Sequence, residues 1–428
     1  METEEGLSSW WGSATGASVA SLSGATYRVR YPGRLNGSGG PDYRGAVLHD
    51  GRRTLLGDVE LHVRASDWRR HGHNRDHAYD NVVLHVVLAD DSDGRTTLAS
   101  GASVPVAVAR VANSDARACA LPCSHLYSQY PARVVEVLET AGIVRLLRKS
   151  RQAAEEVRGA GECSVLLRLV ARAFGYSMNT APFGELARRL CESSVEDTLR
   201  HRGATERRAL VLGVAGLLPF QRCEPGIPCL QEAREYEVVW KDSGLDGCML
   251  PGLAWRLGCM YPNNHPVRRV IGLADLLPAL PGLANGIRLL ACAGGVSGHS
   301  LASLESYIIV PGDSYWRTHY DFGRATRSSN VVGPAKAREV VVNALLPLAV
   351  VSAASRGDTR GLARLTAAMR AYPPCAANAV TGHMSRQLGM AGRAIPAVQA
   401  QGMLRLFQTY CSRGRCAECP LGEWPVAR

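Results

Sequence analysis

The residues most able to do chemistry gather near the N-terminal end of the chain. Half of the histidines fall in one short interval, at positions 49, 62, 71, 73, 77 and 85. Residues 57–63 read Gly-Asp-Val-Glu-Leu-His-Val. If they form a β-strand, Asp58, Glu60 and His62 share one face, because side chains alternate along a strand. Two carboxylates and an imidazole suit a divalent cation. A half-buried strand with a solvated polar face is the alternative.

A second candidate is the pair His71-Gly-His73. On a strand or loop the two imidazoles could converge on one metal ion, whereas on a helix they would point about 200° apart. The helical alternative pairs His73 with His77, and Asp67 with His71, at a spacing of four residues. We expect His85, inside an apolar segment, to be a core histidine with satisfied hydrogen bonds.

Short strands are expected to position these side chains. The pattern favours strands at Tyr27–Arg30, Gly45–His49, Leu55–Arg64, Asn81–Ala89 and Val104–Val111. Asp50-Gly51 suits a tight hairpin between the second and third strands. Ser66 and Asp67 can cap a short helix, on which Trp68 is expected to be a core anchor.

The hydrophobic period becomes helical after about Pro131. Apolar residues at three- and four-residue steps predict helices over Val134–Leu147, Ser164–Phe174, Gly184–Leu190, Glu206–Leu217, Pro266–Leu277, Lys336–Leu346 and Val398–Tyr410. The sequence therefore predicts an α+β protein, with a small mixed α/β domain over residues 1–120 and a larger, mostly α-helical domain over residues 121–428.

The predicted order strand, strand, helix, strand resembles the core of the PD-(D/E)XK nucleases. Pro41-Asp42 opens the first strand and Glu60-Leu-His62 lies on the next. The resemblance implies that Asp42 and Glu60 hold Mg²⁺ or Mn²⁺, that Asp58 assists, and that His62 acts as base or third ligand. Carboxylate-held metal both neutralises a phosphodiester and generates hydroxide. His62 is a departure, because it stands where that superfamily has a lysine, and a neutral imidazole lacks the fixed positive charge.

That superfamily also uses an acid from an N-terminal helix. Here the acid would be Glu4 or Glu5, and nothing in the sequence selects either.

Several runs also resemble a bacterial family of unknown function. They include Gly40–Ala46, Gly57–His62, Ser66–His73, Ala78–Val86 and the closing Tyr410-Cys…Cys419. The resemblance extends over nearly the whole chain from residue 40. Two positions depart from the family pattern: Met260-Tyr-Pro262 stands where Arg-Pro is usual, and Cys375 stands where a Glu is frequent. The resemblance implies relatedness and no particular activity.

Three cysteines close the chain at the spacing Cys411-x₄-Cys416-x₂-Cys419. This is the spacing of plant-type [2Fe–2S] loops, and thiolates in such a turn can also hold structural zinc. We therefore expect zinc or an iron–sulfur cluster here, with free thiols as the alternative. No fourth ligand lies nearby in sequence, and the candidates to supply it are Cys223, Cys229, Cys375 and His383.

The net charge of +11 permits a partner that carries phosphates. Arg268 and Arg269 stand in the first turns of a predicted helix, against the preference of the helix dipole. A bound anion such as a nucleic-acid phosphate would explain their position, and so would arginines that face water.

Thirteen cysteines without a secretory signal indicate a reducing cytoplasm. The most apolar run, Val340–Ala354, is shorter than the roughly 18 residues that a membrane span needs. These features predict a cytoplasmic protein that is not a membrane protein. Together with the resemblance of the N-terminal part to the PD-(D/E)XK core, they lead us to expect a divalent-metal-dependent nuclease. The two alternatives are a non-catalytic scaffold that binds nucleic acid or protein, and a metal-dependent hydrolase of a small substrate that also uses His71 and His73.

Overall fold

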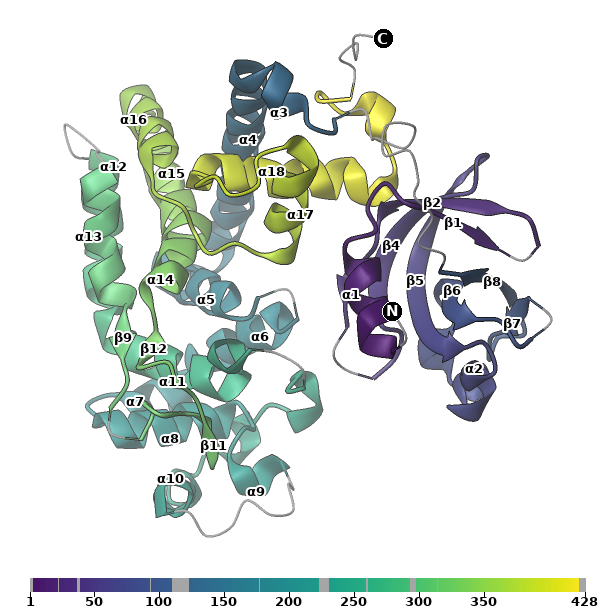
Figure 1. The fold of residues 1–428 in the computed structure, drawn as a ribbon. Helices are drawn as coiled ribbons and strands as arrows, with labels where there is room; N and C mark the ends of the chain where they lie inside the picture. The colour runs from purple at the N-terminus through teal and green to yellow at the C-terminus, as the bar shows by residue number, and fades with distance from the viewer. Residues whose placement is uncertain are drawn as a thin grey trace. The chain divides into compact units, whose positions relative to one another are not determined.

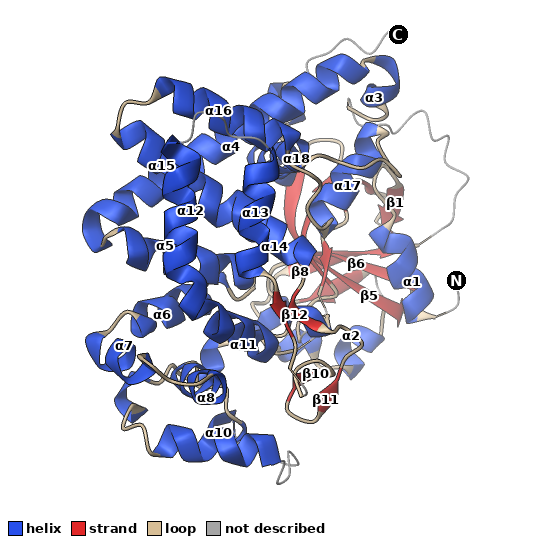
Figure 2. Ribbon diagram, turned by 90° about the vertical axis from the view of Figure 1, so that its left-hand side faces the viewer, coloured by secondary structure: helices blue, strands red, loops and turns tan. Residues whose placement is uncertain are grey.

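The computed structural model describes residues 3–422 except 22, 37–38, 93, 110–122, 177, 223–230, 259–260, 293–297 and 314. A mixed β-sheet comes first and a mostly helical region follows, which confirms the predicted α+β class (Figures 1 and 2).

The chain divides into two compact units. The first, here called the sheet unit, comprises Met1–Ala141, Ala377–Arg393 and Gly402–Arg428. The second, the helical unit, comprises Gly142–Ala376 and Ala394–Gln401. The sheet unit thus extends past the predicted boundary at residue 120 and takes in the C-terminal cysteines, which the sequence analysis assigned to the helical domain.

Eight strands form the sheet, in the order β1-β2-β4-β5-β6-β8-β7 with β3 paired to β4. Their bounds are β1 Ser18–Ser21, β2 Thr26–Tyr31, β3 Arg34–Leu35, β4 Tyr43–His49, β5 Thr54–Arg64, β6 Val82–Ala89, β7 Arg95–Thr97 and β8 Ser103–Val108. β1 also pairs with β8, so the sheet closes on itself through these two strands. The five predicted strands correspond to β2, β4, β5, β6 and β8, with residues 110 and 111 outside the described part.

The central hairpin forms where the sequence predicts it. β4 and β5 are antiparallel, and the carboxylate of Asp50 accepts the backbone N–H groups of Arg52 and Arg53 in the turn. β6 then runs parallel to β5, with Glu60 opposite His85. The connection between them contains α2 (Asp67–Arg70) and the 3₁₀ turns η1 (His73–Arg75) and η2 (His77–Tyr79).

Helix α1 (Glu4–Gly12) covers one face of this sheet. Leu7 and Trp11 of α1 pack in one core cluster with Val59 and Leu61 of β5, and all four are fully buried. Since side chains alternate along β5, burial of these apolar residues turns Glu60 and His62 to the opposite face. The register of the strand therefore fixes the position of its polar residues.

The sheet unit also contains short helical segments from distant parts of the sequence. They are α3 (Leu126–Gln129), the start of α4 (Pro131–Ala160), α17 (Ala379–Leu388), most of α18 (Ala397–Thr409), η8 (Cys411–Arg413) and η9 (Cys416–Glu418).

The helical unit packs its helices around one large apolar core. It contains the greater part of α4 and the start of α18. Its other α-helices are α5 Glu162–Phe174, α6 Thr180–Leu190, α7 Ser193–Leu199, α8 Ala204–Val214, α9 Pro219–Arg222, α10 Gln231–Lys241, α11 Pro266–Leu276, α12 Leu280–Cys292, α13 Gly298–Ile308, α14 Pro334–Val340, α15 Leu346–Ser355 and α16 Thr359–Ala371. Shorter elements are η3 Asp246–Cys248, η4 Gly252–Ala254, η5 Pro262–Asn264, η6 Leu277–Ala279, the π-turn η7 Val341–Leu345, β9 Val310–Pro311, β10 His319–Asp321, β11 Arg324–Ala325 and β12 Asn330–Val332. Each predicted helix is present.

Two helical stretches of the helical unit are strongly apolar. By length and composition alone they could cross a membrane: Pro266–Cys292 and Pro334–Ser355. Between half and two thirds of the most apolar 18 residues of each stretch is buried inside the protein. Core helices of globular proteins share these properties. The second stretch contains the apolar run Val340–Ala354, which is helical and mostly buried.

Candidate metal centre

Asp42 and Glu60 are tied together across the β4–β5 hairpin. The backbone N–H of Asp42 donates to Oε2 of Glu60 at 2.9 Å, and the backbone N–H of Leu61 donates to Oδ2 of Asp42 at 3.0 Å. The other Glu60 oxygen, Oε1, lies 3.3 Å from Nε2 of His73 and 3.6 Å from Nε2 of His62. The hairpin therefore brings the two predicted carboxylates together and directs Glu60 at the imidazoles.

His62 is the centre of a chain of imidazoles. It is buried, and its Nδ1 lies 2.9 Å from Nε2 of His85, while its Nε2 lies 3.2 Å from Nδ1 of His71. The Nδ1 atom of His85 in turn lies 2.8 Å from the hydroxyl of Thr96. His85 is thus the satisfied core histidine that the sequence predicts, and it holds the ring of His62 in one orientation.

His71 and His73 reach this cluster through a tight turn. α2 ends at Arg70 with His71 as its C-cap, and Gly72 follows with φ +79°, a conformation that strains any residue with a Cβ. His73 then opens η1. The two imidazoles therefore converge from a loop, and the helical pairing of His73 with His77 does not form: His77 instead contacts Asp80 at 2.7 Å.

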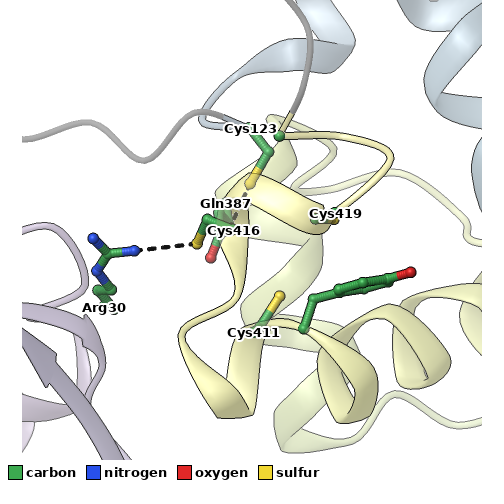
Figure 3. A pocket seen from close by; sticks show the side chains of 8 residues that line it. Arg30, Cys123, Gln387, Cys411, Cys416 and Cys419 are labelled. Atoms are coloured by element: carbon green, nitrogen blue, oxygen red, sulfur yellow. Dashed lines mark hydrogen bonds between the residues drawn. The ribbon is translucent and has the colours of Figure 1, made fainter. Parts of the chain in front are cut away.

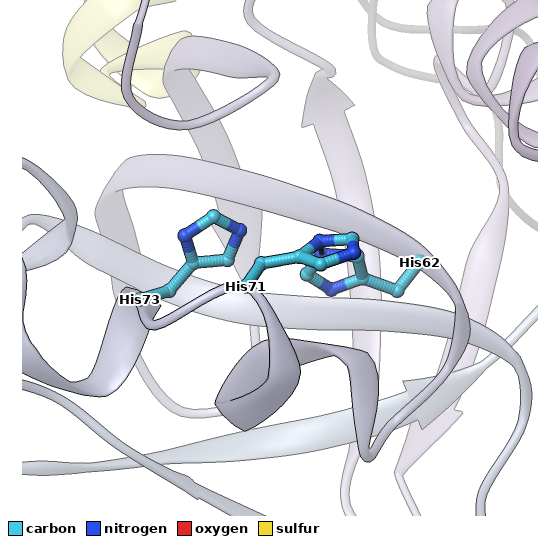
Figure 4. Close-up of side chains that lie close together, drawn as sticks. All are labelled: His62, His71 and His73. Carbon is cyan, nitrogen blue, oxygen red and sulfur yellow. Dashed lines mark hydrogen bonds between the residues drawn. The ribbon is translucent and has the colours of Figure 1, made fainter.

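Each of the three histidines His62, His71 and His73 offers a ring nitrogen within 4.8 Å of the other two (Figure 4). His62 is buried, His73 is half-buried and His71 is exposed. Tyr79 stacks on the ring of His73 with 3.9 Å between centroids, and buried Trp68 packs beside it. One cation could therefore contact the cluster from the solvent side at His71.

Burial has opposite effects on the pKa of the carboxylates and of the imidazoles in this site. It raises the pKa of Glu60 to about 9, with the neighbouring Asp42 carboxylate contributing, and raises that of Asp42 to about 6. It lowers the pKa of both His62 and His85 to about 3. His62 and His85 are therefore neutral at pH 7, as imidazoles that bind a metal must be, and Glu60 requires a nearby positive charge to ionise at neutral pH.

Glu4 is a residue of this site that the sequence could not select. It is the first residue of α1, and its charge contributes to the raised pKa of both Asp42 and Glu60. The packing of α1 against β5 brings it there. No local pattern distinguishes Glu4 from Glu5, since both occupy the first turn of the helix.

Asp58 has a different environment from Glu60. Its Oδ1 accepts the backbone N–H of Gly45 at 2.9 Å, and the β5–β6 register shifts between Asp58 and Val59. The structure thus gives Asp58 a contact within the hairpin. The assisting role in metal binding stays a prediction.

The three C-terminal cysteines line one pocket of the sheet unit. The expected sources of a fourth ligand lie elsewhere: Cys375 belongs to the helical unit, and the His383 ring packs against Tyr31 and Phe407. Cys223 and Cys229 lie outside the described residues. The fourth thiol that lines the pocket is Cys123, which the sequence analysis did not consider.

Arg268 and Arg269 require a correction. Both are buried in the helical unit, at 0% and 3% exposure. Arg268 donates to four backbone carbonyls, those of Trp316, His319, Ser328 and Asn330. The prediction that these arginines contact nucleic-acid phosphates is therefore wrong, because their guanidinium groups are occupied inside the protein.

The comparisons with known proteins yield one match. The model of a protein family whose description assigns no function matches residues 11–377. No curated protein and no solved structure matches the chain.

Proposed function

The chain belongs to the family described as Protein of unknown function (DUF2851), and we propose that it is a divalent-metal-dependent phosphodiesterase that acts on nucleic acid. Membership assigns no activity, so the proposal rests on the site. The observation that carries it is the approach of Glu60 Oε1 to His73 and His62, within a group of three imidazoles whose ring nitrogens lie within 4.8 Å of one another.

The donor set indicates the kind of ion. Imidazoles favour transition metals, and a carboxylate is accepted by most divalent ions. Mg²⁺ prefers oxygen ligands and retains much of its water. Of the ions that the sequence suggested, Mn²⁺ therefore fits a site of Glu60, His71 and His73 better than Mg²⁺, and Zn²⁺ fits it as well.

The chain's own residues have separate tasks in this proposal. Glu60 and His73 hold the ion, His71 holds it from the solvent side, and the backbone N–H of Asp42 fixes the second oxygen of Glu60. His62 is neutral at pH 7, so it can bind the ion or accept a proton. A bound divalent ion neutralises phosphate charge and lowers the pKa of a water ligand.

Two further observations favour a phosphodiester as substrate. The chain carries 49 basic and 38 acidic residues, a balance that attracts polyanions. The order of elements β4, β5, α2, β6 matches the predicted order, with Asp42 and Glu60 at the corresponding positions. The charge of Glu4 adds to the raised pKa of both. This arrangement resembles that of the PD-(D/E)XK nucleases.

The burial of the site supports a second candidate, a hydrolase of a small substrate. Glu60 and His62 are only 4% and 1% exposed, and His71 is the exposed member of the histidine group. A small ester could approach such a centre more easily than a duplex.

The test is cleavage of labelled single- and double-stranded DNA and RNA with Mn²⁺, Zn²⁺ or Mg²⁺. We compare the wild type with Glu60→Gln, which keeps the shape of the side chain and removes its charge. We expect cleavage by the wild type and a decrease of at least about 100-fold in the variant. The matched control is Glu136→Gln, the same substitution at an exposed position of α4, and it should cleave at the wild-type rate.

Equal rates in the wild type and Glu60→Gln would refute the proposed site. A folded, Mn²⁺-bound wild type that cleaves no nucleic acid but hydrolyses small phosphodiesters would favour the second candidate.

A further inference from the structure

Four cysteines from two distant parts of the sequence line one pocket of the sheet unit (Figure 3). Three of them come from the C-terminal segment and one from the segment before α3: Cys411, Cys416, Cys419 and Cys123. All four are free thiols. Arg30 of β2 and Gln387 of α17 complete the lining on the polar side.

The C-terminal segment is folded to present its sulfurs inward. Cys411 begins η8 and Cys416 begins η9. Gly414, between the two turns, has φ +66°, which favours glycine. Gly422 passes so close to the first residue of η9 that a Cβ there would lie 2.0 Å from the carbonyl oxygen of Cys416. The close packing of these turns fixes the backbone around the pocket.

Cys123 is held against the same pocket from another direction. It is buried, and the backbone N–H of His125, two residues later, donates to the carbonyl of Gln387 at 2.9 Å. The side-chain amide of Gln387 donates to the sulfur of Cys123 at 2.8 Å. One backbone hydrogen bond and one side-chain hydrogen bond therefore connect the segment before α3 to α17. These two bonds fix the position of Cys123.

The donors around the sulfurs suit thiolates. Nη1 of Arg30 donates to the sulfur of Cys416 at 3.3 Å, and Gln387 donates to that of Cys123. A thiol is a weak acceptor, whereas a metal-bound thiolate carries negative charge and accepts such bonds. Hydrogen bonds to the ligating sulfurs are a regular feature of iron–sulfur sites.

We propose that four cysteines ligate one iron–sulfur cluster: Cys123, Cys411, Cys416 and Cys419. The three downstream residues have the x₄ and x₂ spacing of plant-type [2Fe–2S] loops, which take their fourth cysteine from a distant position. Cys123 is that distant cysteine here, and it lies upstream of the other three.

The spread of the sulfurs favours a cluster over a single zinc ion. Zinc holds four thiolates at about 2.3 Å, so their sulfurs lie about 3.8 Å apart in a tetrahedron. Among the described residues, only the three histidines place their ligand atoms within 4.8 Å of one another. No three of the four cysteine sulfurs lie that close together. The sulfurs therefore lie farther apart than four thiolates around one zinc ion, and the x₄ and x₂ spacing of the loop favours an iron–sulfur cluster.

The test is the iron, acid-labile sulfide and zinc content of the full chain purified without oxygen, together with its visible absorption. We expect iron and sulfide in equal amounts, and their stoichiometry distinguishes [2Fe–2S] from [4Fe–4S]. Cys123→Ser should lose most of the iron, by about tenfold or more. Cys163→Ser, at an exposed cysteine of α5 in the helical unit, should retain it.

A Cys123→Ser variant with wild-type iron and spectrum would overturn the proposal, and so would stoichiometric zinc without sulfide. If that variant does not fold, alkylation of the wild type decides. In the loaded protein the four cysteines should be protected while Cys163 reacts, and removal of iron should expose them. Cys123 that reacts as fast as Cys163 in the loaded protein would also contradict the proposal.

The cluster is independent of the proposed phosphodiesterase. Glu60→Gln should contain as much iron as the wild type, so failure of one proposal leaves the other testable.

Discussion

The two units of the molecule bury charged groups in different ways. In the helical unit each buried cation described here has its own partners. Arg222 and Asp321 form a two-pronged ion pair at 2.9 Å, Arg208 binds Asp275 in the same way, and Arg268 donates to four carbonyls. Such pairing is the usual condition for burial of charge, and its role is structural.

In the sheet unit the buried ionisable groups face one another. Burial raises the pKa of both Asp42 and Glu60, Asp42 adds to the shift of Glu60, and Glu4 adds to both. Glu60 Oε1 lies 3.6 Å from Nε2 of His62 and 3.3 Å from Nε2 of His73. A divalent cation would satisfy this arrangement. Buried charge is therefore structural where ion-pair or hydrogen-bond partners already satisfy it, and it indicates function where carboxylates lie beside other carboxylates.

The largest effect that the comparison predicts is on the stability of the helical unit. Arg268→Met leaves four buried carbonyl groups without their donor, and we expect a loss on the order of 3–5 kcal/mol in the free energy of unfolding. Urea unfolding measures it. Arg234→Met, at an exposed position of α10, should change the free energy by less than about 0.5 kcal/mol.

Affinity for Mn²⁺ should be unchanged in folded Arg268→Met, since the residue is structural. A stable variant that binds nucleic acid less tightly would contradict the assignment and restore the surface role that the sequence suggested.

A smaller effect is the dependence of stability on pH, which should have opposite signs for the two units. Glu60 has a raised pKa, so the folded state binds more protons than the unfolded state between about pH 4.5 and 9, and stability of the metal-free protein decreases as pH rises through this window. Lys149 of α4, whose amine donates to Asn343, has its pKa lowered by burial to about 7. Its contribution to stability therefore increases as pH rises from about 7 to 10.4.

Urea unfolding between pH 5 and 9 with a chelator present measures both slopes, each at most about 1.4 kcal/mol per pH unit. Glu60→Gln should reduce the loss of stability with rising pH. Lys149→Met should reduce the gain of stability with rising pH. The distinction between the units would be lost if either substitution left the slope unchanged.

Much of the sheet unit follows from local sequence. Alternation along residues 54–64 and the Asp50-Gly51 turn specify the hairpin, and the hairpin places Asp42 beside Glu60. The turn at Gly72 determines that His71 and His73 converge, and the sequence left that choice open, because His-Gly-His is compatible with a loop and with a helix.

Other parts depend on packing that no short pattern encodes. Glu4 and Cys123 reach their sites only through the positions of α1 and α3 in the fold. The burial of Arg268 follows from the helix that carries it rather than from its charge. Its neighbours in α11, Val267, Val270 and Ile271, are apolar on all sides, and a helix with apolar residues all round is expected to be buried.

The most direct test of the metal centre is Mn²⁺ binding by the chelator-treated full chain, measured by titration calorimetry. Thiolates prefer softer ions to Mn²⁺, so the cysteine pocket should not contribute to the measured Mn²⁺ binding. We predict one Mn²⁺ per chain in the wild type and an affinity at least about tenfold lower in His73→Asn. A folded wild type that binds neither Mn²⁺ nor Zn²⁺ at this site, or a His73→Asn variant with unchanged affinity for both, would contradict the account.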